Sequence, residues 1–216
     1  MPPLRKAETV SFKNDDTNRT VAIYYKAARI FHERGYDATS MDDIADALQL
    51  TKAGLYYYIK SKEDLLYRII SYGLDWLDRE VIAPARKLAD PQERVRWIIE
   101  HHGLGLLKSS RVIPLLTDEV SSLSPKHRQI IVRRKRAYLD LLRGTLNALK
   151  REGKLRNLDT TVAAFGLFGM LLWLPRWYQP NGRLTPNETI DHLMNLCLGG
   201  LLVPTLRTSK TLLNNR

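Results

Sequence analysis

The side chains best suited to chemistry lie between residues 39 and 62, where hydroxyl and ammonium groups surround two small residues. Such groups donate hydrogen bonds to phosphates and sugars, and they contact base edges where a helix end comes close. We therefore predict a surface that binds duplex DNA. Six residues are expected to contact the DNA backbone: Thr39, Ser40, Thr51, Tyr57, Lys60 and Lys62. Four residues are expected to face the bases: Lys52, Ala53, Gly54 and Tyr56.

Two short helices and a tight turn would position this surface. Ser40 can cap the first helix, and Asp42 in its first turn suits the positive end of the helix dipole. Residues 49–50 would form the turn, and Thr51 can cap a second helix over residues 52–59. A helix-turn-helix places its second helix in the major groove. The alternative is a short amphipathic helix pair whose tyrosines are half-buried.

The chain from residue 19 to 66 resembles the DNA-binding domain of TetR-type transcriptional regulators. The resemblance rests on AARIFHERGYDATS followed by MDDIADALQLTKAGLYYYIKSKEDLL. The positions that match the family pattern are Phe31, Gly35, Tyr36, Thr39, Ser40, Ile44, Ala45, Leu55, Tyr56, Tyr58, Lys60, Lys62, Glu63 and Leu65. At two positions the chain departs from the pattern. Gln49 replaces a glycine of the turn, where a positive φ would carry strain, and Gly54 replaces a Thr or Ser that commonly contacts a base.

The resemblance implies a regulator, most often a repressor, that acts as a homodimer on a palindromic operator. The second helices of the two subunits would enter successive major grooves about one helical turn apart. A small molecule in the larger domain would favour a conformation in which the helix starting at Lys62 swings these helices out of register. A ligand that binds both conformations equally would release nothing.

The rest of the chain is expected to be helical. Apolar periodicity predicts helices over residues 62–83, 92–108, 126–152, 160–178 and 186–203, with Pro84 ending the first of them. The predicted fold is all-α, with an N-terminal three-helix helix-turn-helix DNA-binding domain and a larger helical ligand-binding and dimerisation domain. We expect a flexible arm over residues 1–16, the DNA-binding domain over 17–62, the larger domain over 63–204 and a tail over 205–216.

The last two predicted helices form the expected dimer interface. Residues 160–178 are apolar almost all round, and residues 186–203 carry a broad apolar stripe. In TetR-type proteins the last two long helices usually pair with their copies as a four-helix bundle, in which glycines allow close packing. The glycines that suit such an interface are Gly166, Gly169, Gly199 and Gly200. An ordinary monomeric core is the alternative.

Net charge by itself says little about DNA binding in this chain. The net charge is +11, yet residues 1–65 hold ten basic and ten acidic side chains, so the excess lies in residues 66–216. Eleven basic residues fall within residues 126–156, against only Asp140 and Glu152. This helix is either a solvated basic surface or a site for an anionic ligand.

A second resemblance implies an acyl-CoA thioester as the anionic ligand. Residues 173–185 look similar to TetR-type regulators of fatty-acid and steroid catabolism, several of which respond to such thioesters. The ligand combines an apolar tail, suited to a helix-lined pocket, with phosphates that arginine binds. The candidate phosphate ligands are Arg133, Arg134 and Arg136. The candidate residues around the tail are Trp97, His101, Leu104, Phe168 and Trp173.

The sequence contains no motif of an enzyme, a cofactor site, a metal site or a membrane span. His101 and His102 are adjacent and therefore do not share a helix face. Cys197 is the single cysteine, which excludes an intrachain disulfide and fits a reducing cytoplasm. The chain start has no apolar segment typical of a secretory signal, and the longest apolar run is too short to cross a bilayer. Two alternatives remain: an architectural DNA-binding protein without an effector, and an interaction protein whose basic helix binds an acidic partner.

Overall fold

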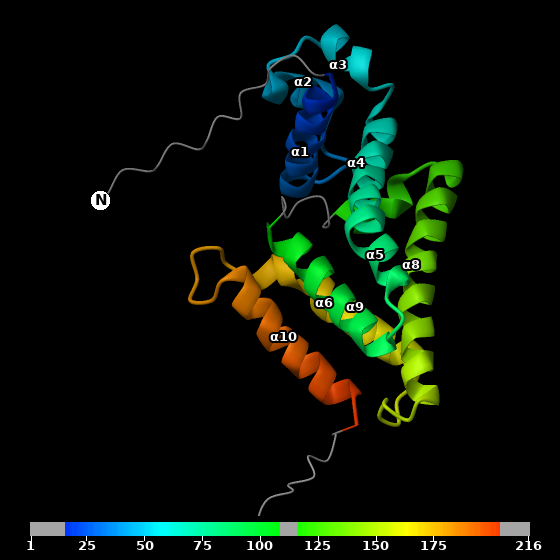
Figure 1. Ribbon diagram of the computed structural model, residues 1–216. Helices are drawn as coiled ribbons and strands as arrows, with labels where there is room; N and C mark the ends of the chain where they lie inside the picture. Colours follow the sequence, from blue (N-terminus) through cyan, green and yellow to red (C-terminus); the bar gives the residue numbers. More distant parts are fainter. Residues whose placement is uncertain (1–15, 109–115, 204–216) are drawn as a thin grey trace, which may run out of the picture. The chain divides into compact units, whose positions relative to one another are not determined.

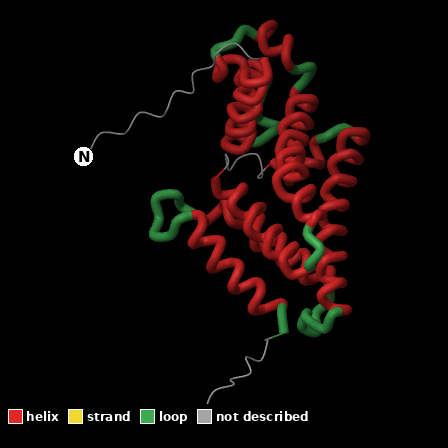
Figure 2. Tube along the Cα trace, in the orientation of Figure 1, coloured by secondary structure: helices red, strands yellow, loops and turns green. Residues whose placement is uncertain are grey.

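The computed structural model describes residues 16–108 and 116–203. Within these ranges the chain forms helices and connecting loops but no β-sheet (Figure 2), which confirms the predicted all-α fold. The predicted arm, apart from residue 16, and the predicted tail lie outside the described residues.

The helices group into two compact units. Of the described residues, unit 1 comprises 16–74 together with 116–131, and unit 2 comprises 75–108 together with 132–203. Two long helices, α4 (Lys62–Leu77) and α8 (Pro125–Arg151), contribute residues to both units.

Unit 1 holds the predicted helix-turn-helix (Figure 1). Besides most of α4 and the first turns of α8, its elements are α1 (Asp16–Arg34), α2 (Met41–Leu48), α3 (Lys52–Tyr58) and the 3-10 helix η2 (Leu116–Ser122). Its interior is apolar, because Phe31, Ile44, Leu55, Ile59 and Leu66 are all buried. Burial of each such side chain stabilises the fold by about 1.5–3 kcal/mol. Leu55 and Ile59 thereby anchor one side of α3 and its end, as their spacing predicts.

The turn between α2 and α3 has the conformation expected from the sequence. Gln49 has a φ of 56°, and its N–H donates to the carbonyl oxygens of Ala45 and Asp46. A residue with a Cβ atom in this left-handed region costs about 1–2 kcal/mol relative to the right-handed one. The two hydrogen bonds that close the end of α2 offset part of this strain.

Unit 2 is built around α6 (Pro91–Lys108), which packs against both α9 (Thr160–Trp177) and α10 (Pro186–Leu201) (Figure 1). The absence of a side chain at two glycines of α6 allows α10 and Trp76 of α4 to approach this helix closely. A Cβ atom on Gly103 would lie 2.5 Å from Ile190 Cδ1 of α10, and one on Gly105 would lie 1.9 Å from Trp76 Cη2. The interior of unit 2 therefore depends on the close approach of α6 to its neighbours.

The prediction that Pro84 ends the helix starting at Lys62 is wrong. A π-helical turn, η1 (Asp78–Ile82), follows α4 and leads into α5 (Ala83–Lys87), which contains Pro84 in its first turn. Proline is tolerated in the first turn of a helix because its missing N–H would have no intrahelical partner there. The π-helical turn leads into a new helical segment that begins before the proline, so helical structure continues to Lys87.

Candidate functional site

Hydroxyl caps begin both helices of the helix-turn-helix, α2 and α3, the second of which is the predicted reading helix. Ser40 and Asp43 form a capping box at the start of α2, and the Thr51 hydroxyl accepts a hydrogen bond of 3.0 Å from the N–H of Gly54. A Cβ atom on Gly54 would lie 3.1 Å from that Thr51 hydroxyl. Gly54, which departs from the family pattern, therefore leaves the Thr51 cap undisturbed and exposes the backbone at the start of α3.

One side of α3 presents polar-tipped side chains to solvent. Tyr57 is 78% exposed and Tyr56 is 43% exposed, and Ala53 and Lys60 also lie on the surface. Lys52 Nζ lies 3.0 Å from the Asp42 carboxylate, and this hydrogen bond raises the pKa of Lys52. Both partners are solvent-exposed, and such a pair contributes little to stability, so Lys52 can readily exchange Asp42 for another anion.

Two of the ten predicted DNA-contact residues have a different environment. Thr39 is buried, and its hydroxyl donates to the Gly35 carbonyl oxygen at 2.8 Å. The Lys62 ammonium lies over the Tyr36 ring, 4.5 Å from its centroid, and donates to the carbonyl oxygens of Tyr36, Asp37 and Thr39 at 3.0–3.3 Å. This geometry gives both side chains a role in holding the loop between α1 and α2, which Lys62 joins to the start of α4.

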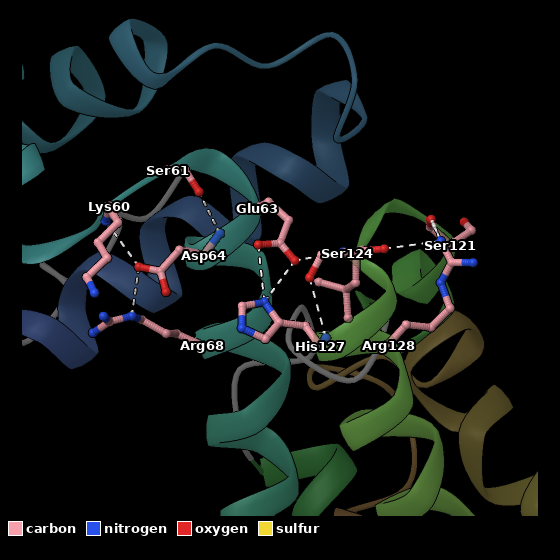
Figure 3. Close-up of polar contacts among 10 residues, drawn as sticks. Lys60, Ser61, Glu63, Asp64, Arg68, Ser121, Ser124, His127 and Arg128 are labelled. Atoms are coloured by element: carbon pink, nitrogen blue, oxygen red, sulfur yellow. Dashed lines mark hydrogen bonds and ion pairs between the residues drawn. The ribbon is translucent and has the colours of Figure 1, made fainter.

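The start of α4 is tied to the segment that follows α3, a feature missed in the sequence (Figure 3). The Asp64 carboxylate accepts from the Lys60 N–H at 3.0 Å and pairs with Arg68 Nε at 3.0 Å. The Asp64 N–H in turn donates to the Ser61 hydroxyl at 3.0 Å. The Ser61-to-Asp64 spacing is a capping signal that could have predicted this arrangement.

In unit 2, the predicted ligand residues of α6 share one face of that helix. The Trp97 and His101 rings stack with their centroids 3.4 Å apart, and His101 Nδ1 lies 3.1 Å from the Trp97 carbonyl oxygen. Leu104 follows one turn later and is half-buried. The indole N–H of Trp97 is buried and makes no hydrogen bond within the described chain.

Phe168 lies beside a buried polar pair that the sequence did not reveal. The Tyr138 hydroxyl is 3.2 Å from His102 Nδ1, and the Phe168 ring centroid lies 4.8 Å from that of Tyr138. Burial lowers the pKa of His102 to about 4 and raises that of Tyr138, so both side chains are neutral at pH 7. The interior of unit 2 therefore contains a neutral donor–acceptor pair among apolar side chains. A tyrosine on the inward face of an otherwise basic helix, Tyr138, is the sequence feature that could have predicted this pair.

The three arginines of α8 that were predicted to bind phosphate differ in exposure and in ion pairing. Arg134 pairs with Asp75 at 2.7 Å and with Asp78 at 2.5 Å. Burial alone would lower the pKa of Arg134, but the bonds to Asp78 and Asp75 raise it. Arg133 and Arg136 are exposed, and the structure gives neither an ion-pair partner in the described chain. These two are therefore better placed than Arg134 to bind an anion.

Trp173 lies apart from Phe168, on the solvent side of α9, where its ring is 57% exposed and lies 4.7 Å from the Arg176 guanidinium. It belongs to a set of exposed apolar side chains that we call the apolar stripe. The members of the apolar stripe are Val162, Phe165, Leu172, Trp173 and Trp177 of α9 and Leu196 of α10. Space is open beside the four predicted interface glycines, since a Cβ atom on any of them would meet nothing within 4 Å.

The described residues contain no group of three or more side chains that could hold a metal ion. Among the helices of the described ranges, none has the length and apolar character needed to cross a membrane.

A fold of this kind, with an exposed reading helix in one unit and a separate helical unit, defines a DNA-binding transcriptional regulator. Residues 23–69 match the sequence family described as bacterial regulatory proteins, tetR family, and residues 88–201 match the family described as tetracyclin repressor-like, C-terminal domain. The chain belongs to the TetR family.

Similar proteins agree with this assignment. The HTH-type transcriptional repressor KstR2 of Rhodococcus jostii (strain RHA1) is 28% identical over 199 residues, covering 88% of this chain and 96% of the relative. A crystal structure of AibR in complex with isovaleryl coenzyme A and operator DNA has a TM-score of 0.75 at 37% identity, over 82% of this chain and 97% of AibR. The structure of the ketosteroid transcriptional regulator KstR2 of Mycobacterium tuberculosis has a TM-score of 0.80 at 26% identity, over 89% of this chain and 98% of that chain.

Proposed function

We propose that this chain is a homodimeric repressor that binds a palindromic operator and is released from it by an acyl-CoA thioester. The observation that carries the proposal is the exposed, polar-tipped side of α3, in a chain 37% identical to a regulator crystallised with both isovaleryl coenzyme A and operator DNA. The relatives named as repressors support the sign of the regulation.

On operator DNA, the side chains at the start of α3 and Tyr56 face the bases, and exposed hydroxyls and Lys60 contact phosphates. The proposed base contacts are Lys52, Ala53, Gly54 and Tyr56, and the proposed backbone contacts are Ser40, Thr51, Tyr57 and Lys60. Thr39 and Lys62 act indirectly, because their contacts with backbone carbonyl groups hold the helices in position.

The dimer forms through α9 and α10. The apolar stripe has few polar groups that water could solvate, and burying it against its own copy removes its surface from water at roughly 25 cal/mol per Å². The open space beside Gly166 and Gly199 allows a second helix to come close there. A two-fold axis through this surface also matches the symmetry of a palindromic operator.

The thioester binds with its phosphates at α8 and its acyl tail toward the interior of unit 2. Arg133 and Arg136 are one turn apart on the surface of α8, which suits them to a polyphosphate. The Phe168 ring offers an apolar contact to an acyl chain, and the neutral pair of His102 and Tyr138 beside it offers hydrogen bonds to a carbonyl group.

The test is calorimetric titration of the full chain with isovaleryl-CoA and longer acyl-CoA thioesters. The double variant Arg133→Gln/Arg136→Gln should bind the best thioester at least about tenfold more weakly, because each lost charge-assisted hydrogen bond costs about 1.5–3 kcal/mol. The matched control is Lys150→Gln/Arg151→Gln, which removes the same charge from the last turn of α8. Equal affinities of the two double variants would contradict the proposed phosphate site.

A further inference from the structure

The second residue of α4 reaches across to the N-terminus of α8 (Figure 3). The Glu63 carboxylate accepts a hydrogen bond of 2.8 Å from the Ser124 N–H, which lies immediately before α8. It also lies 2.9 and 3.1 Å, through its two oxygens, from His127 Nδ1. We call Glu63, Ser124 and His127 the clasp.

A ring contact adds to these hydrogen bonds. Tyr67 stacks on His127 with the ring centroids 3.8 Å apart and the planes at 8°. Glu63 and Tyr67 are four residues apart on α4 and therefore share one face of the helix. This face holds His127 both through its nitrogen and through its ring plane, which fixes the orientation of the imidazole.

The charge of Glu63 suits this position. A carboxylate at a helix N-terminus interacts favourably with the helix dipole and with the free N–H groups of the first turn. Burial alone would raise the pKa of Glu63, but the hydrogen bonds from Ser124 and His127 outweigh it, and the pKa is lowered. The carboxylate therefore remains charged near neutral pH, and the contact with the Ser124 N–H persists there.

Neighbouring contacts connect the clasp to the reading helix on one side and to α8 on the other. Next to Glu63, Asp64 accepts from the Lys60 N–H, two residues after the end of α3. On the α8 side, the Arg128 guanidinium donates to the carbonyl oxygens of Ser121 and Leu123, which holds the segment before α8 to its first turns. Hydrogen bonds of two adjacent residues of α4, Glu63 and Asp64, thus link the start of this helix to the start of α8 and to the segment after α3.

We propose that Glu63 and His127 are positioning residues that couple α8 to α4, so that a displacement of α8 on effector binding moves the reading helix. The inference rests on the proposed function, since coupling presupposes both DNA and an effector. α8 is continuous from Pro125 to Arg151 and carries Arg133 and Arg136, so an anion bound there acts on the same helix that His127 holds. Rigid helices joined by specific contacts are the physical means by which such coupling travels.

The test compares the full-length single variants Glu63→Gln and His127→Ala and their double variant with the wild type. Glu63→Gln keeps an oxygen that can accept from the Ser124 N–H but removes the charge. The control is Arg143→Gln, which breaks an exposed ion pair of 2.9 Å with Asp140 further along α8. The first readout is the ratio of operator Kd with and without saturating isovaleryl-CoA. The second is hydrogen exchange of residues 52–66.

We expect each single variant to reduce the Kd ratio at least about fivefold, the lower end of usual allosteric factors. The double variant should reduce it no further, because both residues belong to one contact. Exchange of residues 52–66 should become at least about threefold faster, as expected when a local contact that limits opening is lost. The control should change neither readout.

If the wild type responds to the thioester and the variants keep its Kd ratio, the coupling is overturned, whatever the exchange shows. If the wild type binds operator but does not respond to the thioester, the proposed effector class is wrong. In that case unchanged exchange at residues 52–66 still overturns the clasp, and faster exchange supports it.

Discussion

Units 1 and 2 both have apolar interiors, but they differ in the side chains that they expose and in the polar groups that they bury. In unit 1 the interior is apolar, as at Leu55 and Ile59, and the exposed tyrosines end in hydroxyl groups. In unit 2 a polar pair, His102 and Tyr138, is buried, while the apolar stripe faces solvent. Of these two features of unit 2, the exposed apolar stripe carries a cost in water that a binding partner would remove.

This difference in exposed surface indicates which surface suits DNA and which suits a second protein surface. A polar-tipped surface such as the exposed side of α3 is well solvated, so exposing it in the absence of DNA costs little free energy. An exposed apolar stripe is stable only when a second apolar surface covers it. A buried neutral pair is stable because its members hydrogen-bond to each other, and protonating either member would be unfavourable.

The largest effect is expected from placing a charge in the apolar stripe. Leu196→Glu would bury two like charges across the proposed two-fold axis, at a cost of several kcal/mol. We expect a monomer by analytical ultracentrifugation and at least about a hundredfold weaker operator binding, since a monomer reads only one half-site. Val132→Glu on α8, also at an exposed apolar residue, is the control and should remain dimeric. A dimeric Leu196→Glu protein would refute the interface.

The next largest effect concerns the buried pair and pH. Because burial lowers the pKa of His102 to about 4, the unfolded chain binds more protons than the native one between about pH 4 and pH 6.5. Stability should therefore fall as the pH is lowered through this range, by about 3 kcal/mol in total at 1.36 kcal/mol per pKa unit. Urea unfolding at several pH values should show this loss in the wild type. The His102→Gln variant should show a shallower slope, and an equal slope would contradict the assignment.

A smaller effect separates holding the helices from contacting DNA. Lys62→Met removes the donor to three carbonyl oxygens and should lower the free energy of unfolding by about 1–3 kcal/mol. Lys60→Met, at an exposed position, should leave the stability within about 0.5 kcal/mol. Chemical denaturation of both variants decides between the roles. A stable Lys62→Met protein with weakened DNA binding would return Lys62 to the phosphate contacts.

The smallest effect sharpens the account of α3. Lys60→Gln should weaken binding to all duplexes alike, by about tenfold, and reduce the slope of log Kd against log salt by about one. Lys150→Gln, an exposed lysine on α8, is the control. Tyr56→Phe should instead change the preference among operator sequences. If Lys60→Gln changed the preference and Tyr56→Phe did not, the division between backbone and base contacts would be reversed.

The sequence predicted unit 1 well because its structure depends on local signals. The cap at Ser40, the positive φ at Gln49 and the buried face of α3 all follow from residue type and short spacing. The sites of unit 2 were harder to predict, because they depend on pairs far apart in the chain. Arg134 with Asp78, and His102 with Tyr138, are joined by helix packing that periodicity alone does not specify. The same reason explains why the clasp was missed.

Fluorescence anisotropy tests the central claim most directly. The purified protein would be titrated onto labelled duplex from the region upstream of its own coding sequence, with and without a panel of acyl-CoA thioesters that includes isovaleryl-CoA. The account predicts binding to one palindromic segment, far tighter than to random duplex, and release by at least one thioester. Equal affinity for that segment and for random duplex would contradict it.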